Sequence, residues 1–184
     1  MSNILIANLN ARLQPMHRGE IFEDPLDHQL QAKGIGSVIG GGTMQSKSGE
    51  VEYCDIEIEV NTDPSAAAQF IAEMLSSIGA PKGSKVVNDE GSLHVPFGNA
   101  EGLAVYLNGT DLPDSTYAEC DSNFVYSEFE RLLNGIGSVL SYWQGPTETA
   151  LYMYGHSFSG MHERLKPFID TYPLCAKARV TQIA

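Results

Sequence analysis

The pentapeptide Gly-Ile-Gly-Ser-Val occurs twice in this chain, at residues 34–38 and again at residues 135–139. In both places it follows apolar residues at helical spacing and precedes a run that is typical of a strand. Glycine just past a helix readily adopts the left-handed backbone that other residues disfavour. The repeat therefore indicates that one fold has been built twice within 184 residues.

The first half of the chain predicts the order β-α-β-β-α-β. Alternation of apolar and polar residues marks the strands, and Asp-Pro pairs mark the helix starts, because aspartate caps a helix and proline suits its first position. The predicted elements are, in order, a strand at 4–13, a helix from Asp24-Pro25 to Gly34, hairpin arms at 37–45 and 51–60, a helix from Asp63-Pro64 to Gly79, and a strand at 85–87.

The second half repeats this order. Beyond a possible short strand at 93–95, the predicted elements are a strand at 103–107, a helix from the Asp121 region to Asn134-Gly135, strands at 139–143 and 150–155, a helix capped by Ser157 or Ser159, and a strand at 178–183. The order resembles the ferredoxin-like superfold in tandem, with repeats at residues 1–89 and 90–184. This resemblance implies an α+β protein with antiparallel sheets and helices on one face. It implies no activity, because the superfold hosts many functions.

The charge of the chain limits the classes of partner. There are 23 acidic and 11 basic residues, a net charge of −12. Such a surface repels nucleic acid and anionic membranes, so we expect neither as a partner. It suits either simple solubility or attraction of a basic protein, and homo-oligomerisation stays open.

The cysteines and the N-terminal residues predict the compartment. Cys54, Cys120 and Cys175 are odd in number and form no Cys-x-x-Cys pair, which favours reduced thiols. The first residues lack the basic and apolar regions of a secretory signal. We therefore expect a cytoplasmic protein.

A row of carboxylates is the strongest functional signal in the sequence. In the second hairpin arm, Asp55, Glu57 and Glu59 alternate with apolar residues, with Tyr53 at the end of the row. Like charges on one strand face repel, and they are tolerated where that face meets water or a cation. The row is either a solvated face or the binding site for a basic protein, as in inhibitors and immunity proteins of basic toxins.

A second hypothesis places a small ligand near a glycine run. Gly40, Gly41, Gly42 and Thr43 mark either a bulge and close packing or an anion-binding nest, and Trp143 is a possible ligand anchor. A sensor of this kind resembles ACT-type regulatory domains. The glycine spacing also approaches a dinucleotide fingerprint, but here it follows a helix instead of opening one, so no cofactor is predicted.

A third hypothesis is hydrolysis by Ser157. The segment Gly155-His-Ser-Phe-Ser159 resembles the nucleophile elbow of α/β-hydrolases, but the only histidine after Ser157 is His162, which lies five residues on, within the same predicted helix, so no downstream base is available. We therefore expect Ser157 to cap a helix and predict no catalytic residue. His156, His162 and Glu163 lack the spacing of a metal site. The prediction is a non-catalytic, acidic binding protein.

Overall fold

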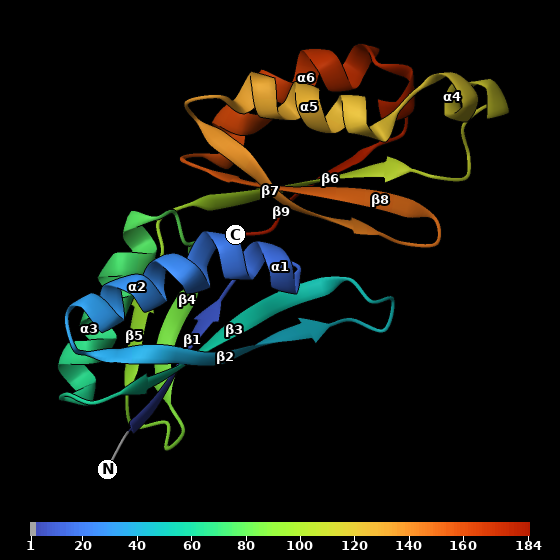
Figure 1. The fold of residues 1–184 in the computed structure, drawn as a ribbon. Helices are drawn as coiled ribbons and strands as arrows, with labels where there is room; N and C mark the ends of the chain where they lie inside the picture. The colour runs from blue at the N-terminus through green and yellow to red at the C-terminus, as the bar shows by residue number, and fades with distance from the viewer. Residues whose placement is uncertain (1–2) are drawn as a thin grey trace. The chain divides into compact units, whose positions relative to one another are not determined.

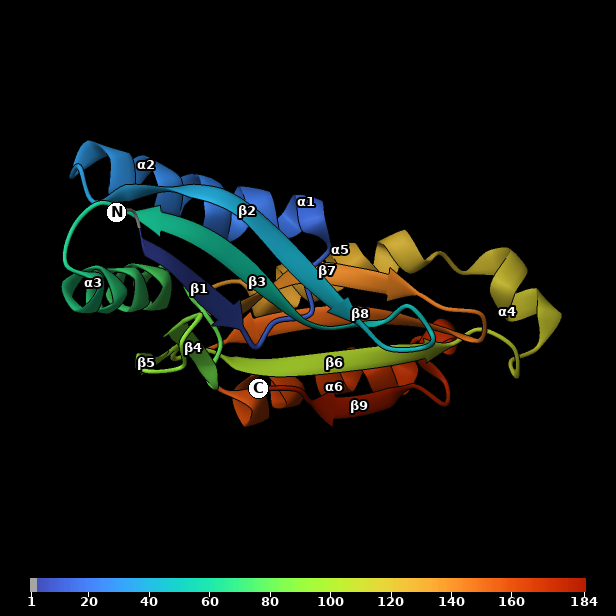
Figure 2. The same cartoon turned by 90° about the horizontal axis from the view of Figure 1, so that it is seen from below.

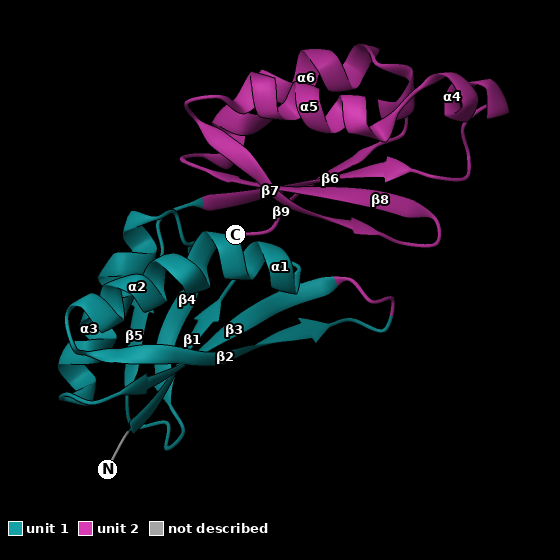
Figure 3. Cartoon of the chain, viewed as in Figure 1, with its two compact units in different colours: residues 1–47, 51–100 teal, residues 48–50, 101–184 magenta. Residues whose placement is uncertain are grey.

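The computed structural model describes residues 3–184, which divide into two compact units (Figure 3). Unit 1 covers the chain up to Lys47 together with Val51–Ala100, and unit 2 covers Ser48–Glu50 and Glu101–Ala184. No helix of the described part is long and apolar enough to cross a membrane.

Unit 1 is an antiparallel sheet with helices on one face. Its strand order is β2-β3-β1-β4-β5 (Figure 2), and α2 contacts β2 while α3 contacts β1, β4 and β5. Its elements are β1 (Asn3–Leu9), α1 (Pro15–Arg18), α2 (Asp24–Ala32), β2 (Gly36–Gln45), β3 (Val51–Val60), α3 (Pro64–Ser77), β4 (Ser84–Asn88) and β5 (His94–Phe97).

Unit 2 repeats the arrangement with strand order β7-β8-β6-β9, and α5 and α6 cover one face of this sheet (Figure 1). Its elements are β6 (Glu101–Asn108), α4 (Asp114–Glu119), α5 (Ser122–Leu133), β7 (Gly137–Gln144), β8 (Glu148–Gly155), α6 (Phe158–Thr171) and β9 (Arg179–Gln182). In chain order, both units place their first four sheet strands as second, third, first, fourth. The predicted tandem ferredoxin-like α+β fold is confirmed.

The repeated pentapeptide has the same role in both units. Gly34 and Gly135 follow a helix and precede an edge strand, with φ of +66° and +85°. Gly36 and Gly137 begin that strand. A β-carbon on Gly36 would lie 2.0 Å from the Glu59 carbonyl oxygen, and one on Gly137 would lie 2.7 Å from Met161 Sδ. The first glycine thus serves the turn, and the second allows close packing.

A β-bulge follows each pentapeptide and is held by a carboxylate. The register shifts between Val38 and Gly40 in unit 1 and between Val139 and Ser141 in unit 2. The Val38 N–H donates to Asp27 Oδ1 of α2 at 2.8 Å, and the Val139 N–H donates to Glu130 Oε1 of α5 at 2.6 Å. Each helix therefore satisfies a backbone donor on its edge strand, which also blunts that edge.

The predicted start of the first helix is wrong. Asp24 is already helical, with φ −61° and ψ −47°, and the helical segment begins at Pro15. A π-helical turn at Gly19–Glu23 joins α1 to α2 directly before Pro25. Proline lacks the N–H of a regular helical bond, and the wider turn accommodates this gap. The Asp-Pro pair therefore lies inside the helical segment.

The predicted boundary between residues 89 and 90 is also corrected. It falls in the turn that joins β4 to β5, and β5 pairs with β4 in the same sheet. Unit 1 therefore continues to Ala100. Two other predicted caps are confirmed, because Asp63 accepts from the Ala66 N–H and Ser157 from the Gly160 N–H. In the region where α5 was expected to start, the cap is Asp121, which accepts from the Asn123 N–H.

Candidate functional site

The carboxylate row lies on the face of β3 that points away from the helices. Cys54, Ile56 and Ile58 are 0% exposed, whereas Asp55 and Glu59 are half-buried and Glu57 is exposed. The predicted alternation is confirmed. Successive carboxylates on one face of a strand are about 6.6 Å apart, so the row spans about 13 Å.

Strand β1 borders one side of the row with mostly apolar side chains. Ile4 lies opposite Glu59, Ile6 opposite Glu57 and Asn8 opposite Asp55. The Asn8 Nδ2 donates to Asp55 Oδ1 at 2.8 Å, which fixes the orientation of this carboxylate. The row is therefore flanked by apolar surface and anchored at one end by an amide.

Strand β2 borders the other side with glycine. Gly40 lies opposite Glu57, and Gly42 lies opposite Asp55. A β-carbon on Gly40 would be 3.4 Å from Glu57 Oε2, and one on Gly42 would be 3.8 Å from Asp55 Oδ2. On the β2 side, both carboxylates thus lie beside glycine backbone with no side chain between them and the solvent.

Gly41 points to the opposite face, where it leaves room for a buried ion pair. Its β-carbon would be 2.5 Å from Glu23 Oε1 and 2.9 Å from Arg18 Nη2. Arg18 is 7% exposed, and its Nε donates to Glu23 Oε1 at 2.5 Å. Its Nη1 donates to the Gly42 carbonyl and to Thr43 Oγ1, each at 2.8 Å. The β-bulge after Val38 and the close packing of Arg18 and Glu23 against Gly41 thus account for the glycine run.

Sequence reasoning missed Arg18, because a lone arginine near a chain turn gives no local sign of burial. The glycine run at Gly40–Gly42 indicated that another group packs closely against this strand, but it did not indicate which residue. Trp143, the other proposed ligand residue, lies on β7 of unit 2 opposite Ala150, and its ring packs over Gly145. A ligand-binding role for these residues stays a prediction.

The row makes no ion pair with the rest of the described chain. Between residues 3 and 184, no ion pair involves Asp55, Glu57 or Glu59. Tyr53, at the end of the row, lies opposite Met44 and is half-buried. The three carboxylates can therefore attract cationic groups from solution.

Two of the thiols are buried, and Ser157 caps α6. Burial raises the pKa of the Cys54 thiol to about 12, against the opposing effect of the Arg18 guanidinium, and burial likewise raises the pKa of Cys175 to about 12. Both stay protonated at neutral pH. Ser157 Oγ accepts from the Gly160 N–H at 3.3 Å and lies 2.9 Å from Ser159 Oγ. Residues 3–184 hold no group of three or more metal-ligating side chains.

Comparisons with known proteins identify no family for this chain. No family model matches the sequence, and no curated protein does. A putative monooxygenase from Fusobacterium nucleatum is similar with a TM-score of 0.32 and 11% identity, over 98% of this chain and 90% of that one. The first two RRM domains of a yeast poly(U)-binding protein give 0.26 and 15%, over 98% and 99%.

The regulatory subunit of aspartate kinase from Thermus flavus is similar with a TM-score of 0.30 and 11% identity, over 91% of this chain and 94% of that one. These scores are too low to support any inference about fold or function. The fold assignment therefore rests on the strand order and connections of each unit.

Proposed function

We propose that this protein is a non-catalytic binding protein that engages a basic protein partner through the carboxylate row of unit 1, in the manner of an inhibitor or immunity protein. The observation that carries the proposal is the combination of three outward carboxylates, bare glycine backbone beside two of them, and the lack of an internal ion pair for the row among residues 3–184. Such rows speed association with an oppositely charged surface and select against acidic partners.

The small-molecule hypothesis has less support. The buried Arg18–Glu23 pair fills the helix side of the glycine run, so a ligand at Gly40–Thr43 could approach only from the side of the carboxylates. That side favours cations, whereas a backbone nest favours anions. The same residues therefore suit the basic-partner proposal better.

The test compares two triple variants of equal net charge. One replaces the row (Asp55→Asn, Glu57→Gln, Glu59→Gln), and the matched control replaces exposed carboxylates of unit 2 (Asp114→Asn, Glu119→Gln, Glu163→Gln). Proteins captured from the native lysate by the unmodified chain are identified and purified. Their association rate constants are then measured at several salt concentrations.

We expect the row variant to associate about tenfold more slowly and with a flatter salt dependence, since the lost attraction is long-range. The control variant should keep both the rate and the salt dependence. Equal behaviour of the two variants would overturn the proposal. Covalent labelling of Ser157 by a fluorophosphonate probe would instead favour the hydrolase hypothesis.

A further inference from the structure

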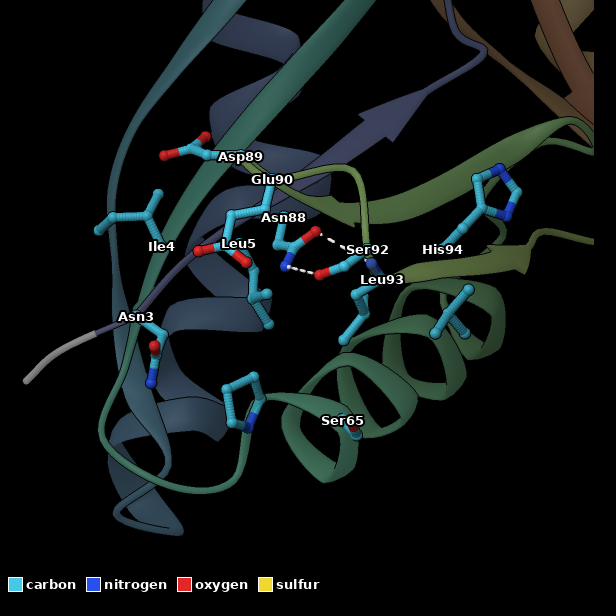
Figure 4. Close-up of a pocket in the computed structure, with 12 residues that line it drawn as sticks. Asn3, Ile4, Leu5, Ser65, Asn88, Asp89, Glu90, Ser92, Leu93 and His94 are labelled. Atoms are coloured by element: carbon cyan, nitrogen blue, oxygen red, sulfur yellow. Dashed lines mark hydrogen bonds between the residues drawn. The ribbon is translucent and has the colours of Figure 1, made fainter.

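A hollow of about 710 Å³ lies in unit 1 at the end of the sheet where β1 begins (Figure 4). Its walls are the first residues of β1, the first turn of α3 and the turn between β4 and β5. This volume is within the range of pockets that bind small groups. The lining residues are Asn3, Ile4, Leu5, Pro64, Ser65, Asn88, Asp89, Glu90, Ser92, Leu93, His94 and Val95.

The hollow lies beyond the Glu59 end of the carboxylate row, on the helix side of the sheet. Ile4, which lines the hollow, is the partner of Glu59 across the β1–β3 ladder. Leu5, also in the lining, is 0% exposed and pairs with Asn88 of β4, on the side of the sheet that α3 covers. A segment that follows the row past Glu59 therefore reaches the hollow by turning over the end of β1.

The lining combines apolar walls with carboxylates. Ile4, Pro64 and Leu93 provide apolar surface. The side chain of Glu90 extends from the β4–β5 turn towards the start of β1, whereas that of Asp89 points away from the other labelled residues (Figure 4). No ion pair within residues 3–184 involves either carboxylate.

The turn that carries Glu90 is held in place by Asn88. Its Nδ2 donates to Ser92 Oγ at 2.9 Å, and its Oδ1 accepts from the Leu93 N–H at 3.0 Å (Figure 4). Gly91 supplies the positive φ of +67° that the turn needs. Glu90 and Leu93 are thus presented by an internally bonded turn.

Resting on the proposed function, we infer that the hollow receives an arginine side chain from the end of a basic segment of the partner. This segment lies extended along Asp55, Glu57 and Glu59, with cationic residues at alternate positions, and its last residue turns over the end of β1. An arginine stem packs on apolar surface while its planar head pairs with a carboxylate. An extended segment repeats side chains at the same pitch as the row. The occupant therefore has cations at alternate positions.

Defined peptides test this inference. The main probe is fluorescent Arg-Ser-Arg-Ser-Arg-Ser-Arg, which reads the same in both directions, and its partner probe carries neutral citrulline at both ends. Binding of each is measured by fluorescence polarisation at low salt. The proteins are the unmodified chain, Glu90→Gln, Leu93→Ala, the row variant and Glu119→Gln as the matched control.

We expect the unmodified chain and Glu119→Gln to prefer the arginine ends by about two- to fivefold, the range of a partly exposed ion pair. Glu90→Gln should lose this preference, and Leu93→Ala should weaken binding of the arginine-ended probe without changing its salt dependence. A peptide with the same composition but four consecutive arginines should bind less tightly than the alternating one.

Two different failures are distinguishable. If the row variant weakens binding but Glu90→Gln keeps the preference for arginine ends, the hollow is not the anchor, and the inference is overturned while the proposed function stands. If the row variant binds as tightly as Glu119→Gln, the proposed function itself fails. Free N-acetylarginine methylamide that binds as tightly as the peptide would show a small-molecule site instead.

Discussion

The two units carry different side chains at matching positions of one scaffold. The pairs Gly36–Val60 and Gly137–Gly155 open the matching ladders, and this register places Glu59 and Glu57 where unit 2 has Tyr154 and Tyr152. By the same register, Gly42 in unit 1 matches Trp143 in unit 2. Glu57, Glu59 and Gly42 of unit 1 thus match aromatic residues of unit 2, whereas Asp55 matches Ala150.

Two of the tyrosines of unit 2, Tyr106 and Tyr152, have partners within that unit. Tyr106 and Tyr152 donate their hydroxyls to Glu50 Oε1 at 2.6 and 2.8 Å, and the Arg179 guanidinium lies 3.7 Å from the centre of the Tyr106 ring. Neither Glu57 nor Glu59 takes part in an ion pair within residues 3–184. Both units thus share the pentapeptide glycines, the β-bulges and the carboxylates that hold them, Asp27 and Glu130, which we call the bulge clamps. These shared features specify the fold, whereas the outward strand positions differ between the units.

The largest expected effect concerns the ion pair beneath the glycine run. Arg18→Met leaves the Glu23 carboxylate without its partner and removes the donor to Gly42 and Thr43, so it should lower the free energy of unfolding by about 3–5 kcal/mol. Urea unfolding measures the change. Arg131→Met, which breaks an exposed pair with Glu128 in unit 2, should cause no measurable loss.

Substitution of the second glycine of the pentapeptide should affect the two units differently. Gly36→Ala drives a β-carbon into a backbone oxygen and should cost about 3 kcal/mol, whereas Gly137→Ala meets first the flexible Met161 side chain and should cost less. Thermal melts of the two variants check the order. Equal losses would mean that the two strand starts are packed alike.

The bulge clamps should behave alike. Asp27→Ala and Glu130→Ala each leave a backbone N–H without its acceptor, and each should cost about 1–2 kcal/mol. Asp27→Asn and Glu130→Gln keep an acceptor oxygen and should cost less, as chemical unfolding can show. A loss in only one unit would contradict the shared role of the clamp.

The first glycine should also have the same effect in both units. No atom lies within 4 Å of a β-carbon placed on Gly34 or Gly135, so the cost of alanine is the strained backbone alone, about 1 kcal/mol each. Asparagine tolerates the left-handed region and should cost less. An unchanged melting temperature for Gly135→Ala would count against the cap.

The smallest effect on stability is expected for the carboxylate row. The row variant removes repulsion along one strand face, so its free energy of unfolding should stay unchanged or rise by up to about 0.5 kcal/mol. High salt should abolish any difference, since salt screens exposed charges. A clear loss of stability would show that the row has a structural role.

Much of the fold was predictable because its signals are local. The alternation of β3 predicted the faces of Cys54 and Asp55, and Asp63 and Ser157 were recognisable as caps from the residues beside them. The start of the first helix was not predictable from the Asp24-Pro25 pair. A capping pair looks the same at a helix start and inside a helix that absorbs proline in a π-helical turn.

The candidate site was predictable only in part. The sequence indicated the row itself, because side chains at alternate positions of a strand share a face. It did not indicate that Gly40 and Gly42 lie beneath Glu57 and Asp55, because a β-bulge sets that register. Nor did it indicate the hollow, whose walls come from three separate segments.

By itself, the sequence determined the duplication, the repeated β-α-β-β-α-β order and the two faces of β1 and β3, since these depend on residues near one another in the chain. Only the tertiary structure decided that Arg18 fills the space beside Gly41, that Asp27 and Glu130 clamp the bulges, and that β5 extends unit 1 to Ala100. Each of these depends on strand register and on the packing of helix against sheet. A residue pattern specifies which side a side chain faces, but the long-range pairing of strands specifies what it meets there.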